Sequence, residues 1–271
     1  MQYALLMGVL ASLACGVVGS YVVVKRIGYI SGGIAHSVLG GMGIAYFLGM
    51  NPIHGAIVSA LIAAIIIGLV SLKVHQHEDT VIGAIWAIGM AVGVIFISKT
   101  PGYNVDLMSY LFGNILLVSK SDLITITILY LGILISVAVF YKQFLAVCFD
   151  EEYAKLQGIN VTLIYLLLLC LIALTVVILI RVVGLILVIA LLTLPAAIAG
   201  HYSKSLIGMM ITASILGIIF TTLGLAVSYQ PNLPAGATII IIAGTVYLLS
   251  FAYKSLSRNL RLRKTQNGKT S

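Results

Sequence analysis

Long apolar stretches separated by short polar turns run from the first residues to about position 253. A helix needs about 20 apolar residues to cross the roughly 30 Å of bilayer hydrocarbon. Glycine, proline and asparagine mark the turns between the stretches. The pattern predicts an all-α, polytopic membrane protein of eight to nine transmembrane helices, with candidate spans at about 3–24, 33–49, 52–72, 80–98, 121–141, 162–181, 183–199, 206–228 and 234–253.

Three segments leave alternatives open at this level. The stretches 33–49 and 183–199 are short, so either could be broken or tilted, and 33–49 could dip into the membrane without crossing it. The segment Leu107 to Val118 is apolar but too short to cross. It suits a re-entrant element, which needs cover from protein or a water-filled cavity, and a plain surface helix equally well.

The composition requires lipid as the solvent for much of the chain. Hydrophobic residues make up 61% and charged residues 8%, with a mean hydropathy of +1.19, whereas soluble domains carry about a quarter charged residues. The net charge of +8 does not indicate nucleic acid, because six of the 15 basic residues lie in the last 18 positions. We divide the chain into a transmembrane domain, 1–253, and a basic tail at the membrane surface, 254–271.

The basic residues also predict an orientation. Nine spans with the N-terminus outside put the C-terminus in the cytoplasm. Lys99, Lys120 and Arg181 then fall outside, whereas the cytoplasmic side receives the six tail residues together with Lys25, Arg26, Lys73, Lys142, Lys155 and Lys204. This asymmetry follows the positive-inside rule.

The chain lacks the motifs of an enzyme. It has no GxxxxGK[ST] phosphate loop, no HExxH and no GxSxG. We therefore expect no ATPase site of its own, and energy must come from a partner or an ion gradient. Cys15, Cys148 and Cys170 are too far apart for a zinc motif and do not form a disulfide framework.

Ionisable residues inside a membrane are costly and usually functional. His36 lies near the predicted cytoplasmic start of the second span, and an imidazole suits a transition metal on a transport pathway. The alternative is a histidine hydrogen-bonded to the backbone of a neighbouring helix. His54 and Asp106 fall near the predicted outer mouth and are further pathway candidates, although Asp106 also suits a helix cap.

The turn from His75 to Thr80 brings His75 and His77 close to two carboxylates. His75 and His77 are candidates for a cytoplasmic exit site, since such tracts bind metals. Asp79 is better explained as a first-turn carboxylate that the helix dipole favours.

Several motifs together resemble one family. In order and spacing, the chain from about Gly8 to Tyr253 resembles the permease subunits of bacterial ABC importers for zinc, manganese and iron, with the stretch around Asp106 most similar to zinc permeases. The motifs are RIGYISGGIAHSVLGG (26–41), EDTVIGAIWA (78–87), VDLMSYLFGNILLVSKSDL (105–123), DEEYAKLQGI (150–159), VGLILVIALLTLPAAIAGHYSKS (183–205) and NLPAGATIII (232–241).

The resemblance implies a fold, partners and a coupling segment. The fold would be a type II ABC-importer-like permease in the bacterial inner membrane. Two permease copies would pair with two cytoplasmic ATPase subunits, and an extracytoplasmic metal-binding protein would deliver the ion. We expect a span to end at Pro195 and a coupling helix to follow it as far as Lys204, including Ala196, Ala197 and His201. Glu151 and Glu152 would lie in a second cytoplasmic contact.

We therefore expect a permease for a divalent transition metal, zinc first, that works by alternating access and holds no permanent cofactor. The alternatives are a manganese or iron permease, a siderophore or chelate permease, and a secondary transporter. A secondary transporter would need carboxylates deep within the spans, whereas every acidic residue falls at a predicted span end or in a loop.

Overall fold

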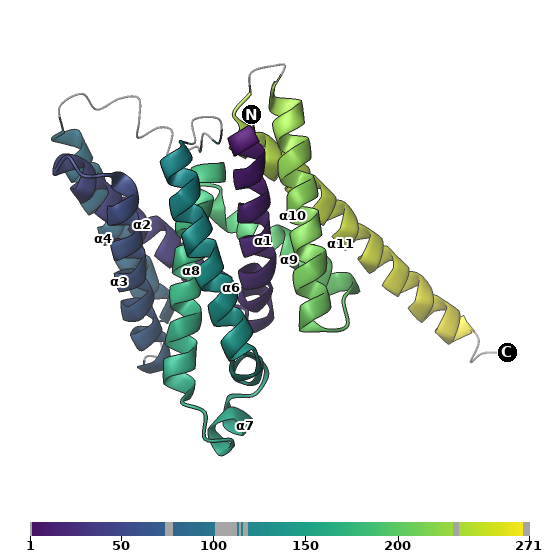
Figure 1. The fold of residues 1–271 in the computed structure, drawn as a ribbon. Helices are drawn as coiled ribbons and strands as arrows, with labels where there is room; N and C mark the ends of the chain where they lie inside the picture. The colour runs from purple at the N-terminus through teal and green to yellow at the C-terminus, as the bar shows by residue number, and fades with distance from the viewer. Residues whose placement is uncertain are drawn as a thin grey trace.

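The computed structural model describes residues 2–73, 78–100, 113, 115, 119–229 and 233–267, without the side chains of residues 78, 181 and 256–267. In these residues the fold is helical and contains no strand, which confirms the predicted all-α class. The helices (Figure 1) are α1 (Gln2–Lys25), α2 (Gly28–Phe47), α3 (Pro52–Lys73), α4 (Glu78–Ser98), α6 (Lys120–Phe149), α7 (Glu151–Leu156), α8 (Val161–Val183), α9 (Val188–Tyr202), α10 (Leu206–Tyr229) and α11 (Ala235–Asn267).

Eight of these helices are long and apolar enough to cross a membrane: α1, α2, α3, α4, α6, α8, α10 and α11. The second predicted span is among them, because α2 begins at Gly28 instead of residue 33 and reaches 20 residues. The seventh predicted span, 183–199, becomes α9, which has only 15 residues and is about 22 Å long. Gly184, with φ of 83°, ends α8, and the turn that follows shortens the next helix.

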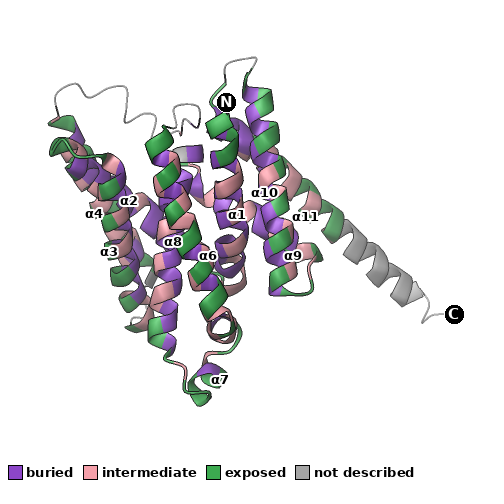
Figure 2. Ribbon diagram, viewed as in Figure 1, coloured by how far each residue is buried: buried purple, intermediate pink, exposed green. Residues whose placement is uncertain are grey.

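Burial separates interior helices from peripheral ones. The apolar windows of α2 and α8 are 72% buried and that of α1 is 67% buried, whereas those of α4 and α6 are 17% and 22% buried. Figure 2 shows exposed positions along the outer surfaces of the peripheral helices. Because these exposed faces are apolar, lipid is the environment that suits them.

In Figure 1, α2, α3 and α4 form one group, α1, α6 and α8 lie centrally, and α9, α10 and α11 form a second group. The first group joins the centre through α3 and α8, and the second joins it through the contacts of α1 with α9 and α10. Small residues permit this packing: Gly16 faces the backbone of Ser214, so α1 and α10 approach closely. Close approach maximises dispersion attraction, which drives helix association in lipid.

The helix α6 extends beyond its predicted span of 121–141. Its backbone departs from helical angles at Phe140 (φ −100°, ψ 15°) and the helix continues to Phe149. Ser119 begins α6 with a capping box, because its Oγ accepts from the Asp122 N–H while the Asp122 carboxylate accepts from the Ser119 N–H. Asp150 separates α6 from α7, and its carboxylate accepts a hydrogen bond from the Tyr153 N–H at 2.9 Å.

Candidate functional site

The helix α2 lies between α3 and α4 with backbone against backbone. A Cβ added at Gly40 would lie 2.8 Å from the carbonyl oxygen of Gly89, and one at Gly43 would lie 2.6 Å from that of Gly93. On the opposite side of α2, Gly41 meets the carbonyl of Gly55 in α3. These contacts leave no room for side chains, so they fix the spacing of α2 and α4. We call the contact between α2 and α4, at Gly40 with Gly89 and Gly43 with Gly93, the α2–α4 seam.

His36 lies within the α2–α4 seam. Its imidazole stacks on the indole of Trp86 in α4, with ring centroids 4.3 Å apart and planes 3° from parallel. The Trp86 Nε1–H donates a hydrogen bond to the Met90 sulfur at 2.8 Å. His36 Nδ1 is buried and has no hydrogen-bond partner among the described residues. The alternative role, a histidine hydrogen-bonded to the backbone of a neighbouring helix, finds no such bond to the His36 ring among the described residues.

His36 also lies deeper than its sequence position suggested. The prediction put it at the cytoplasmic start of a span beginning at residue 33. Because α2 begins at Gly28, His36 is its ninth residue, about 12 Å along the axis. An unpartnered imidazole nitrogen at this depth can serve as a ligand for a passing cation, since a buried polar atom without a partner is otherwise a cost.

The other predicted pathway residues do not join His36. His54 is exposed in the first turn of α3, at the end where α2 finishes. Asp106, His75 and His77 lie outside the described residues, as does most of the segment Leu107 to Val118. Among the described residues, no three His, Cys, Asp or Glu side chains gather in a way that could hold a metal ion.

At the end of the molecule opposite His54, an ion pair connects α1 and α7. Lys25, the last residue of α1, forms a salt bridge with Glu151 at the start of α7, and its Nζ also donates to the carbonyl of Val147 at 2.9 Å. Glu151, which the resemblance put at a partner contact, therefore has a partner inside the chain. Glu152 beside it is exposed. Asp79 is also exposed, in the first turn of α4 as expected.

The proposed coupling segment needs a correction at its start. Pro195 was predicted to end a span, but it lies inside α9, which runs without interruption to Tyr202. The missing proline N–H costs one helical hydrogen bond, a loss that membrane helices tolerate when neighbouring helices cover the site. Here Pro195 and Ala196 are buried, and Gly19 of α1 meets the carbonyl of Leu192. The Ala196 side chain therefore faces the interior of this chain.

The residues that follow open onto a groove. We call it the α9 groove; its volume is about 810 Å³, and it brings together the ends of α1, α6 and α9 with α11. Ala197, His201 and Lys204 line it, as do Arg26 and Phe149. The structure thus gathers three of the five residues predicted from the coupling segment at one accessible surface.

The end of α9 is anchored by α11. His201 Nδ1 lies 3.4 Å from Ser250 Oγ, and Tyr202 Oη lies 3.1 Å from the same atom. Lys254 Nζ donates to the His201 carbonyl at 3.2 Å. His201 lies beyond the eight spans, where burial and then the Lys254 charge lower its pKa below the ordinary value.

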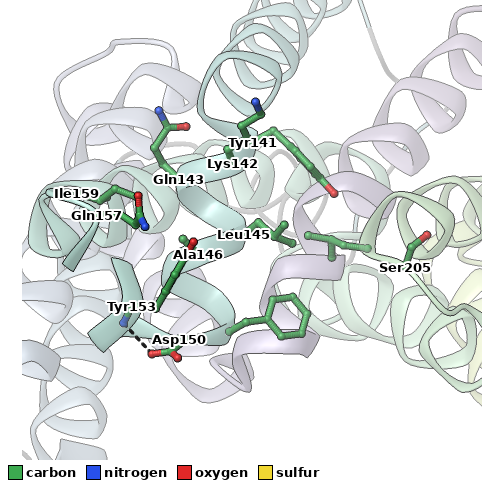
Figure 3. A pocket seen from close by; sticks show the side chains of 12 residues that line it. Tyr141, Lys142, Gln143, Leu145, Ala146, Asp150, Tyr153, Gln157, Ile159 and Ser205 are labelled. Carbon is green, nitrogen blue, oxygen red and sulfur yellow. Dashed lines mark hydrogen bonds between the residues drawn. The ribbon is translucent and has the colours of Figure 1, made fainter. Parts of the chain in front are cut away.

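A second groove of about 800 Å³ lies beside the first, between the end of α6, α7 and the α9–α10 turn (Figure 3). We call it the α6–α7 groove. Tyr141, Gln143 and Tyr153 line it, and Ser205 closes it on the α10 side. Phe149 and Ser205 line both grooves. The end of the molecule that carries α7 therefore presents two adjacent grooves with shared lining residues.

Sequence reasoning missed two residues of these sites. Trp86 lies within the motif EDTVIGAIWA and is the chain's single tryptophan, which was a signal that went unused. Lys25 was treated only as a topology marker. Its partner Glu151 lies more than a hundred residues away in the sequence, so no local pattern could have identified the pair.

Comparison with known proteins agrees with this arrangement. The model of the ABC 3 transport family matches residues 1–254. A protein of Chlamydia trachomatis named "Probable metal transport system membrane protein" is 48% identical, with 90% of this chain and 85% of that protein covered. The "Manganese transport system membrane protein MntC" of Listeria monocytogenes is 35% identical, with coverage of 93% and 90%.

A solved structure has the same fold. The chain superposes on a chain of PsaBC from Streptococcus pneumoniae, solved in complex with Fab, with a TM-score of 0.84, 35% identity and coverage of 92% and 90%. The resemblance to ABC-importer permeases found in the sequence motifs is confirmed. The chain is a multi-pass membrane protein that belongs to the ABC 3 transport family.

Proposed function

We propose that this chain is the permease of an ATP-driven importer of a divalent transition metal ion. The observation that carries the proposal is His36, a histidine deep in a crossing helix whose Nδ1 is buried without a hydrogen-bond partner among the described residues. Family membership supplies the transport context. An imidazole is a suitable transient ligand for such ions, and a pathway needs few ligands so that the ion is released.

The sequence motifs favour zinc as the transported ion. The printed name of the Listeria relative adds manganese. Imidazole binds both metals, with zinc favoured intrinsically, so a manganese permease would depend on geometry and on delivery to exclude zinc. We therefore propose zinc or manganese as cargo and let competition decide between them.

The energy would come from separate subunits. Two copies of this chain would associate with two cytoplasmic ATPase subunits, and an extracytoplasmic binding protein would deliver the ion at the end that carries His54. The bacterial cytoplasmic membrane would hold the complex with the N-terminus outside and the basic tail, 254–271, in the cytoplasm, which requires the shorter apolar helix α9 to complete a ninth crossing beside the eight long spans. The cluster of Lys25, Arg26 and Lys204 at one end supports this orientation.

Coupling would act through the α9 groove. ATP-driven closure of the ATPase dimer would press on the accessible end of α9, from Ala197 to Lys204. Because α9 packs on α1 and α10, a push there would rock the second helix group against the first, and His36 would face each side of the membrane in turn.

The test is uptake of radiolabelled zinc or manganese into proteoliposomes that contain the chain with its ATPase and binding protein, or the chain alone. We expect uptake only with the partners and ATP. His36→Gln should abolish uptake while basal ATP hydrolysis and assembly remain. Ser37→Ala is the matched control, because among the described residues the Ser37 hydroxyl donates only to the Gly33 carbonyl within α2.

Each result has a clear meaning. Uptake by the chain alone would replace the importer with a secondary transporter or channel. Normal uptake in His36→Gln would remove His36 from the pathway. The unlabelled metal that competes best identifies the cargo.

A further inference from the structure

In the α2–α4 seam, the ring of His36 stacks on the ring of Trp86, a contact to which the transport proposal assigns no role. Trp86 covers one face of the His36 ring in a nearly parallel arrangement. Its own orientation is fixed by the hydrogen bond from Nε1 to the sulfur of Met90, one turn further along α4. The close glycine contacts at Gly40 and Gly43 hold the two helices at the distance that this stack requires.

A histidine that binds a metal usually has its ring oriented by a hydrogen bond from its other nitrogen to a carboxylate or carbonyl. Neither ring nitrogen of His36 has such a partner in the described part of the chain, so no hydrogen bond orients the ring whichever nitrogen binds the metal. The second side-chain torsion of histidine is intrinsically broad, so without a partner the ring plane would be poorly defined. Stacking supplies the missing constraint. It also leaves the lone pair of the unprotonated nitrogen free, because this lone pair lies in the ring plane and not on its face.

We propose that Trp86 is a positioning residue that holds the His36 imidazole in the orientation required for metal binding, with Met90 fixing the indole. This inference rests on the proposed function of His36. It assigns to Trp86 and Met90 the orienting role that a hydrogen-bond acceptor has in other metal sites. Loss of such orienting contacts costs about 10- to 100-fold in metal affinity.

The chain itself provides a spectroscopic readout. Trp86 is its only tryptophan, so the fluorescence of the purified full-length chain reports on the stack. Paramagnetic Mn²⁺ bound at His36 should quench this emission, with a midpoint at the concentration where radiolabelled manganese binds. His36→Gln should remove the saturable quenching.

The variants separate orientation from packing. Trp86→Leu removes the aromatic face, and Trp86→Phe keeps a ring that can stack. Met90→Leu removes the sulfur acceptor at similar volume. Phe96→Leu is the matched control. Among the described residues Phe96 makes a separate aromatic contact between α2 and α4, with the Phe47 ring centroid at 5.4 Å, and no ring contact with His36.

For each variant, binding of radiolabelled manganese and zinc to the purified chain is measured beside its thermal unfolding midpoint in detergent. We expect Trp86→Leu to weaken binding by about 10- to 100-fold, Trp86→Phe to restore most of it, and Met90→Leu to lie between them. Phe96→Leu should bind as the wild type.

Three results would overturn the inference. If Trp86→Leu binds as the wild type while His36→Gln does not, His36 keeps its role and Trp86 has none. If Phe96→Leu and Trp86→Leu lose binding equally, the effect is loss of helix packing. If His36→Gln binds both metals normally, the proposed pathway fails first and the positioning role fails with it.

Discussion

The α2–α4 seam and the end of α9 carry the two proposed functions and are held in different ways. Along the seam, glycine backbones touch, and the Nδ1 of His36 is left without a partner among the described residues. At the end of α9, side chains of α11 hold the helix through hydrogen bonds, and grooves lie on both sides of Phe149. The first region is closely packed, whereas the second is accessible and polar.

This difference fits two separate tasks. A residue that meets an ion inside the membrane needs a fixed geometry, which close backbone contact provides. A surface that receives a push from another subunit needs accessible groups and hydrogen bonds that can be exchanged for others. The comparison predicts that substitutions of the seam glycines act through packing, whereas substitutions at the end of α9 act on coupling and leave the fold intact.

The largest effect should follow from a single methyl group in the seam. In Gly43→Ala the new Cβ would lie 2.6 Å from the carbonyl oxygen of Gly93 and 2.8 Å from its Cα, so α2 and α4 must separate. We expect a loss of about 1–3 kcal/mol in stability and of metal uptake, measured by thermal unfolding in detergent and by transport. Gly132→Ala is the control, because nothing lies within 4 Å of its added Cβ; equal losses in both would refute the seam argument.

At the end of α9, Ala197→Glu places a carboxylate in the α9 groove and should uncouple ATP hydrolysis from uptake. Coupling between distant sites typically changes an affinity by about 5- to 150-fold. We therefore expect uptake to decrease by a factor of this order while the unfolding midpoint stays unchanged. The control is Thr80→Glu, an exposed first-turn position of α4 where the helix dipole favours an acid. Normal coupling in Ala197→Glu would exclude this segment as the coupler.

The Lys25–Glu151 pair should contribute less. Lys25 and Glu151 side chains are 17% and 42% exposed, and exposed pairs are worth about 0.2–1 kcal/mol. A double-mutant cycle of Lys25→Met and Glu151→Gln should give a coupling energy in this range from unfolding midpoints. The same cycle with Glu152→Gln should give none; a larger value there would mean that the charge of α7, not the pair, is what matters.

The smallest effect concerns pH. The folded-state pKa of His201 is lowered, so its contribution to stability is fully present above the unfolded value of about 6.5. It is lost as the pH falls toward the folded value, because the unfolded state then binds the proton more readily. We expect a lower unfolding midpoint at pH 5.5 than at pH 8, and a smaller difference in His201→Gln. His54→Gln controls for the loss of a histidine as such; an unchanged pH dependence in His201→Gln would contradict the assignment.

The residues of the α9 segment illustrate why part of the structure escaped prediction. The apolar run and the turn glycine were visible in the sequence, but the sequence does not show where α9 begins or that it continues through Pro195. Whether a proline ends a helix depends on how well neighbouring helices cover the site, and here α1 and α10 provide that cover. Local pattern therefore predicted a break where tertiary contacts allow a continuous helix.

The sequence by itself determined the helical class, the position of most spans and the family, because hydropathy, turn residues and motif order are local properties. It also made His36 a candidate pathway residue, which stays a prediction. Only the tertiary structure decided that His36 is stacked on Trp86, that Lys25 pairs with Glu151 and that Ala197, His201 and Lys204 share a groove. Each of these depends on the distance between helices far apart in the chain, which is set by where small residues let backbones meet.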